Sequence, residues 1–140
     1  MIVGVFRAVA LAALLLAAPA TQSRAGSDAS AIRQIISDQI AALGEEDFET
    51  AFSYASPGIR SIFGDAERFA RMVRGGFAMV LRPSAIRFAA LEERGEEMMQ
   101  SVLVTDENGA LHVLDYHMQP SGQGWLINGV TIRRPPESGA

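Results

Sequence analysis

The sequence predicts an α+β fold in which helices from the first half of the chain pack on a curved, four-stranded antiparallel sheet formed by the second half. Two changes along the chain indicate this order. Apolar residues recur at helical spacing up to about residue 74, and from residue 85 onward they alternate as they do in strands. The chain also has no cysteine, so a hydrophobic core has to stabilise the fold without disulfides.

The first residues have the pattern of a cleavable export signal. Arg7 precedes an apolar run over residues 8–20, which is shorter than the roughly 20 apolar residues that a membrane-spanning helix needs. An uncleaved membrane anchor is the less favoured alternative. Small residues suit signal peptidase both at Ala18 and Ala20 and at Ser23 and Ala25, and of these two sites we favour cleavage after Ala25. The expected parts are a signal peptide over residues 1–25, one domain over residues 26–134 and a flexible tail over residues 135–140.

Composition restricts the location and the partners of this domain. All 12 basic residues are arginines and two of them, Arg7 and Arg24, lie in the expected signal, whereas none of the 16 acidic residues does. The exported domain is therefore more acidic than the whole chain, whose net charge is −4, and it repels phosphate backbones. We expect a periplasmic or secreted protein with no nucleic-acid partner, no cofactor and no membrane attachment once the signal is removed.

Helix capping signals divide the first half of the mature chain. The first helix carries isoleucines at helical spacing, and the later segments begin after short acidic or Ser-Pro signals. The expected starts are Ser27 or Ser30, the acidic cluster 45–47, Ser56-Pro57 and Asp65, and the expected ends are Gly44 and Gly75-Gly76.

Four strands are expected, over residues 85–91, 98–105, 110–118 and 125–132. Asn108-Gly109 predicts a two-residue type I′ hairpin loop. With that loop, parity places Leu103 under the helices together with Leu114, Tyr116 and Met118, and it places Val102, Val104, Leu111 and Val113 on the outer face with Asp115 and His117. A three-residue loop would instead send Val102 and Val104 inward. A bulge at Asn128-Gly129 is expected to return Val130 and Ile132 to the face of Trp125 and Ile127.

Several short motifs resemble a known family: Phe52-x-x-Ala55-Ser56-Pro57-x-Ile59, Phe63-Gly64, Phe69-x-x-Met72-Val73 and Gly124-Trp125-x-Ile127-x-Gly129-Val130. They are similar to a bacterial family of exported proteins designated domain of unknown function 4864, which looks like a member of the nuclear-transport-factor-2-like (cystatin-like cone) superfamily. The resemblance implies helices on the concave side of a curved sheet, with a pocket at the open end. It implies no particular reaction, because cone folds include enzymes, binding modules and dimerisation domains.

The residue pattern offers candidates for a ligand pocket but no catalytic or metal-binding residue. Polar tips on an apolar inner face are typical of small-ligand sites, although such residues also complete cores. The pocket candidates are Tyr54, Tyr116, Trp125 and Asn128. The pair Asp115 and His117 is expected to point away from the helices. His112 and His117 lie an odd number of residues apart, so one straight strand cannot bring both to one metal.

Two functions are consistent with these observations. We favour a non-catalytic module that binds a small apolar ligand or a protein, and the alternative is a small cofactor-independent lyase or isomerase with a cone fold. Whether the protein is an enzyme stays open. The outer apolar residues Val102, Val104, Leu111 and Val113 predict a homodimer joined through the sheet, because an apolar patch of this kind marks an interaction surface.

Overall fold

The structure is a computed structural model that describes residues 21–122 and 124–134. The residues 1–20 of the expected export signal and the expected tail over residues 135–140 lie outside this range. The helical half comprises α1 (Thr21–Gly44), α2 (Phe48–Ser53), α3 (Pro57–Phe63), α4 (Ala66–Gly76) and the short 3₁₀ helix η1 (Ala78–Val80). The other half is a sheet of β1 (Ala85–Arg94), β2 (Glu97–Thr105), β3 (Leu111–Ser121) and β4 (Gly124–Arg133).

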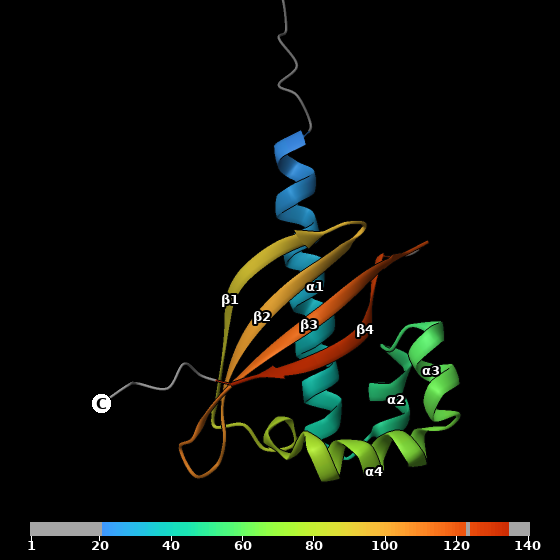
Figure 1. The fold of residues 1–140 in the computed structure, drawn as a ribbon, viewed down its shortest axis with the longest axis vertical. Helices are drawn as coiled ribbons and strands as arrows, with labels where there is room; N and C mark the ends of the chain where they lie inside the picture. The colour runs from blue at the N-terminus through green and yellow to red at the C-terminus, as the bar shows by residue number, and fades with distance from the viewer. Residues whose placement is uncertain (1–20, 123, 135–140) are drawn as a thin grey trace, which may run out of the picture.

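The order of the elements and the antiparallel sheet confirm the expected α+β class. Neighbouring strands along the chain pair with each other, so the sheet has the meander order β1-β2-β3-β4. Figure 1 shows α1 crossing one side of the curved sheet, with α2 and α3 beside the β4 edge and α4 running below them. Within the described residues, no helix has both the length and the apolar character needed to cross a bilayer.

Side-chain caps start three of the helices where the sequence predicts them. Asp47, Ser56 and Asp65 each accept a hydrogen bond from the backbone N–H three residues further on. The first helix differs, because it already exists at Thr21 and contains Ser27 and Ser30 as interior residues instead of caps. The helix continues through Gly26, whose cost in a helix is only about 1 kcal/mol.

The loop between β2 and β3 is not the expected two-residue type I′ turn. The N–H of Asp106 donates to the carbonyl of Ala110, and the N–H of Gly109 donates to the carbonyl of Asp106, so the loop proper is residues 107–109. Gly109 has a positive φ of 85°, whereas Asn108 does not have the positive φ that a type I′ turn requires. The Asp106 carboxylate accepts from the N–H groups of Asn108 and Ala110 at 2.9 Å and stabilises the longer loop.

This extra loop residue reverses the faces that were assigned to β2. Val102 pairs with Leu114 and Val104 with His112, so both valines point toward the helices, where they are fully buried. Leu103 pairs with Val113 on the outer face instead. Of the apolar residues expected on the outer face, Leu111 and Val113 are found there, joined by Leu103, whereas Val102 and Val104 are not. The homodimer stays a prediction.

The faces assigned to β3 and β4 are correct. Met118 pairs with Ile127 but His117 pairs with Gly129, so Asn128 is the extra residue of a bulge. Beyond the bulge, Val130 lies opposite Tyr116 and Ile132 opposite Leu114, on the side of the helices. The core therefore lies between this side of the sheet and the apolar faces of α1 and α4.

Candidate ligand-binding cavity

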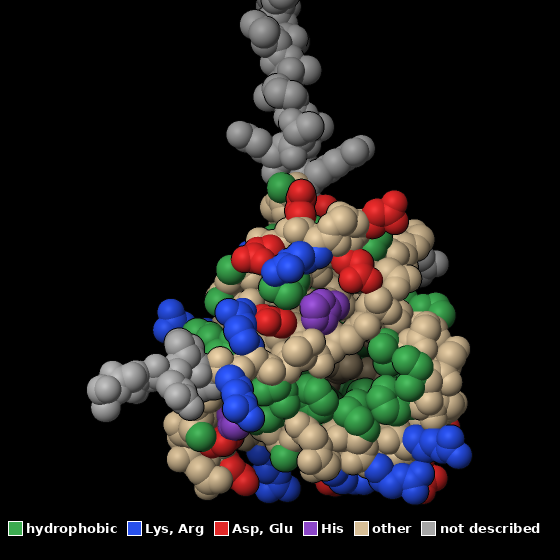
Figure 2. Space-filling model, viewed as in Figure 1, with side chains coloured by type: hydrophobic (Ala, Val, Ile, Leu, Met, Phe, Trp, Pro, Cys, Tyr) green, Lys and Arg blue, Asp and Glu red, His purple; other side chains and the backbone are tan. Residues whose placement is uncertain are grey.

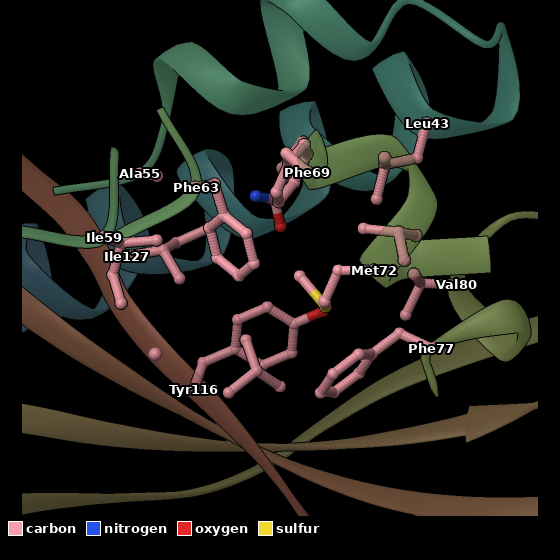
Figure 3. A pocket seen from close by; sticks show the side chains of 14 residues that line it. Leu43, Ala55, Ile59, Phe63, Phe69, Met72, Phe77, Val80, Tyr116 and Ile127 are labelled. Atoms are coloured by element: carbon pink, nitrogen blue, oxygen red, sulfur yellow. The ribbon is translucent and has the colours of Figure 1, made fainter. Parts of the chain in front are cut away.

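A cavity of about 220 Å³ lies between the helices and the second half of the sheet. Half of its lining residues come from α3, α4 and the segment that follows α4, and β3 and β4 lie on the other side (Figure 3). Figure 2 shows the hollow on the surface, rimmed by hydrophobic side chains between β4 and the helices. The lining residues are Gln39, Leu43, Ala55, Ile59, Phe63, Phe69, Met72, Val73, Phe77, Val80, Tyr116, Ile127, Gly129 and Val130.

The helical wall of the cavity follows from the apolar spacing of α4. Phe69, Met72 and Val73 lie at positions i, i+3 and i+4, so they share one face of the helix and line the cavity together. The ring of Phe69 packs against Phe52 at 5.2 Å and edge-on to Phe63 at 6.1 Å between ring centroids. These aromatic contacts hold α4 against α2 and α3 and keep the wall in place.

On the sheet side of the cavity, hydrogen bonds among Ser56, Asn128 and Glu97 join the linker between α2 and α3 to β4 and β2. The hydroxyl of Ser56, which is fully buried, donates to the Asn128 side-chain oxygen at 2.7 Å, and the Asn128 amide donates to Glu97 at 2.7 Å. Backbone bonds support it, from Ser56 N–H to the Ile127 carbonyl and from Ile127 N–H to the Tyr54 carbonyl. The linker between α2 and α3 is thereby fastened to the β4 bulge, beside the cavity residues Ala55, Ile59 and Ile127.

Tyr116 supplies a hydroxyl to this apolar space. Only 1% of the residue is exposed, and in Figure 3 its ring extends from β3 toward Met72 and Phe77. The hydroxyl forms no hydrogen bond with any described residue, and burial alone raises the pKa of Tyr116 well above its ordinary value. Since no side-chain oxygen of the described residues is both sealed from solvent and unpartnered, this hydroxyl must be open to the cavity.

Gln39 of α1 is the other polar side chain of the lining. It is 6% exposed, and its Nε2 donates to the carbonyl of Ala51 at 3.3 Å. That bond orients the amide and leaves its oxygen available as an acceptor. Apart from Tyr116, none of the lining residues has a titratable side chain, so the described cavity contains neither a carboxylate nor an imidazole.

Only Tyr116 of the four sequence-based pocket candidates lines the cavity. Tyr54 is half-buried against the core and offers its backbone to the bulge, and Asn128 holds the Ser56 linker. Trp125 is half-buried near the start of β4, where its indole N–H donates to Asp28 of α1 at 3.3 Å. The four candidates thus include only one of the residues that form the cavity.

The other lining residues, which the sequence did not indicate, are mainly apolar residues of the helical half, together with Gln39 and with Ile127, Gly129 and Val130 of β4. Their signal was present as helical periodicity in α4, but periodicity shows which side of a helix is inward and not where packing leaves a space. Gln39 could have been noticed as a polar residue one position before the buried Ile40 of α1.

Other polar groups lie away from this cavity. Asp115 and His117 face outward as expected. Ser101 and Arg133 both donate hydrogen bonds to Asp115. The ring of His117 forms a hydrogen bond with Thr131 at 3.1 Å. His112, on the opposite side of the strand, contacts Asp106 at 2.8 Å. No cluster of three or more potential metal ligands occurs among the described residues.

The fold and the cavity together define a small α+β domain with an apolar, ligand-sized space between its helices and its sheet. Residues 25–140 match the model of a family described as Domain of unknown function (DUF4864), and the chain belongs to this family. Neither a curated protein nor a solved structure matches the chain significantly.

Proposed function

We propose that the protein is an exported, non-catalytic module that binds a small, mainly apolar molecule in the cavity beside Tyr116. The observation that carries this proposal is the lining, which is almost wholly apolar and contains one inward hydroxyl with no partner among the residues that the structure describes. Apolar walls with a few placed polar groups are the usual chemistry of small-molecule sites. The open cone of the nuclear-transport-factor-2-like superfamily is the fold that we propose for it.

The size of the cavity limits the ligand. An apolar protein cavity of roughly 150 Å³ holds benzene. On the same scale, a cavity of about 220 Å³ accommodates about nine non-hydrogen atoms. A substituted single ring fits this space, whereas a larger ligand would have to extend through the opening seen in Figure 2.

The alternative function, a cofactor-independent lyase or isomerase, receives less support from the lining. Proton abstraction next to a carbonyl needs a base whose pKa lies near the working pH. Tyr116 is the only titratable side chain among the described lining residues, and burial raises its pKa, so it remains a protonated donor at neutral pH. Such a group orients a ligand more readily than it removes a proton from one.

Export is the second part of the proposal, and it rests on the Arg7 and apolar pattern of the N-terminus. The family match begins at residue 25, at the boundary expected for the signal. Among the residues whose side chains the structure describes, the first buried one of α1 is Ile32, which lies well beyond the expected cleavage site after Ala25.

Ligand-dependent thermal stabilisation tests the binding function, since a ligand that binds only the folded state raises Tm. The probes are acetophenone and α-methylstyrene, each with nine non-hydrogen atoms. We expect stabilisation of the wild type by at least one probe and its loss in Val130→Trp, which fills the cavity from β4. The matched control is Thr131→Trp on the outer face of the same strand. No stabilisation of the wild type, or equal stabilisation of Val130→Trp, would contradict the proposal.

A further inference from the structure

We infer that the ligand is a neutral molecule with a hydrogen-bond acceptor, such as a ketone or ether oxygen, and that this acceptor binds the hydroxyl of Tyr116. This inference rests on the proposed binding function and adds the chemical class of the ligand. It follows from the position of the Tyr116 hydroxyl in a nearly apolar lining, whose other polar side chain, Gln39, already donates to the carbonyl of Ala51.

The Tyr116 hydroxyl has room for a partner but has none within the described part of the protein. Tyr116 is 99% buried, with 1% of its surface exposed, and burial is the cause of its raised pKa, with no hydrogen bond contributing. A buried tyrosine hydroxyl usually bonds to a protein group or to water. Its orientation into the cavity in Figure 3 means that an occupant of the cavity can supply the missing acceptor.

The hydroxyl acts as a donor in this pairing. Because burial raises the pKa of Tyr116, the phenol stays protonated throughout the physiological range. A ligand oxygen without its own proton therefore satisfies it. A hydrocarbon of the same shape fills the same space but leaves the hydroxyl unpaired, which lowers its affinity.

The lining also selects against charge. The described cavity residues include no arginine, lysine or histidine that would compensate an anion, and no carboxylate that would compensate a cation. Moving an ionised group from water into such a space without a partner is strongly unfavourable. A carboxylate ligand of the same size should accordingly be rejected even though its oxygens are good acceptors.

Three probes of nine non-hydrogen atoms separate these properties. Acetophenone has the acceptor, α-methylstyrene replaces the carbonyl oxygen by a methylene group at nearly the same shape, and benzoate adds a negative charge. Isothermal titration of the folded protein with each probe is compared with titration of Tyr116→Phe. This variant removes only the hydroxyl, which bonds to no described residue, and circular dichroism verifies that it folds.

We expect acetophenone to bind the wild type about 5–10-fold more tightly than it binds Tyr116→Phe, as for one neutral hydrogen bond. α-Methylstyrene should bind Tyr116→Phe at least as tightly as the wild type, because the variant has no hydroxyl for the hydrocarbon to leave unpaired. Benzoate should bind neither protein at the same concentrations. Equal binding of acetophenone to both proteins, or benzoate binding as tight as acetophenone, would overturn the inference while the cavity could still bind ligands. Failure of all three probes to bind the wild type would overturn the binding function itself.

Discussion

Asp115 and Arg133 form a two-bond ion pair across neighbouring strands on the outer face of the sheet. Arg133 Nε donates to Asp115 Oδ2 at 3.1 Å, and Arg133 Nη2 donates to Asp115 Oδ1 at 2.7 Å. Ser101 donates to the same carboxylate at 2.7 Å. The hydrogen bonds from Arg133 are the main reason why the pKa of Asp115 lies below its ordinary value, and the bond from Ser101 lowers it further. Partial burial acts in the opposite direction.

The first prediction concerns the pH dependence of this pair. Arg133→Met should lower the free energy of unfolding at pH 7, by a modest amount because the arginine is largely exposed to solvent. Because the folded pKa of Asp115 is depressed, the contribution of the pair is fully present above the unfolded value of about 4 and is lost as the pH falls through the lower folded pKa. Urea unfolding at several pH values measures it.

The control for this prediction is Arg134→Met, which removes the same charge from the next residue, an exposed one. The difference between the wild type and Arg133→Met should be constant from about pH 7 to pH 5 and should shrink below about pH 4. A difference that persists unchanged at pH 3, or an equal loss in Arg134→Met, would show that the ion pair is not its source.

The second prediction tests the register of β2 and β3 with one charge placed at two sites. Val102→Asp should prevent folding, because Val102 is fully buried and an aspartate there has no partner. Val113→Asp, on the outer face, should fold with a loss within about 1 kcal/mol. Circular dichroism with urea unfolding measures both. The two-residue loop expected from Asn108-Gly109 would place Val102 on the outer face of the sheet. A well-folded Val102→Asp would therefore support that loop and contradict the observed pairing of β2 with β3.

The third prediction concerns the connection between the α2–α3 linker and β4. Ser56→Ala removes both the N-cap of α3, where the hydroxyl accepts from Ile59 N–H at 3.3 Å, and the bond to Asn128. We expect a loss of about 1–3 kcal/mol in the free energy of unfolding, since a cap is worth about 1 kcal/mol and the bond to Asn128 contributes a similar amount.

The comparison for Ser56→Ala is Ser61→Ala, which removes an exposed hydroxyl bond within the same helix. Ser61→Ala should change the stability by less than about 0.5 kcal/mol. If the two variants lose equal stability, Ser56 is not the link that holds α3 to the sheet.

The sequence predicted the elements well where local chemistry decides them. Caps at Asp47, Ser56 and Asp65 and the bulge at Asn128 are short-range features, and all four are confirmed. The predicted pairing of β2 with β3 was wrong because the carboxylate of Asp106, just before the loop, accepts hydrogen bonds from two backbone N–H groups. These bonds stabilise a loop that is one residue longer than expected.

The cavity was harder to predict than the fold. It arises where side chains from α1, α3, α4, β3 and β4 fail to fill the space between them. Such a space depends on the distance between elements far apart in the sequence, which no local pattern encodes. Tyr116 was nevertheless identified, because strand parity alone placed its polar tip on the apolar inner face.

The central claim is that small neutral molecules bind inside the cavity and not on the outer face of the sheet. A ¹H–¹⁵N NMR titration with acetophenone tests this claim most directly. The claim predicts saturable shifts concentrated in α4, around Tyr116 and in β4 after the bulge, and it predicts their loss in Val130→Trp. Shifts that are absent up to the solubility limit, or that centre on the outer residues Leu111 and Val113, would contradict it.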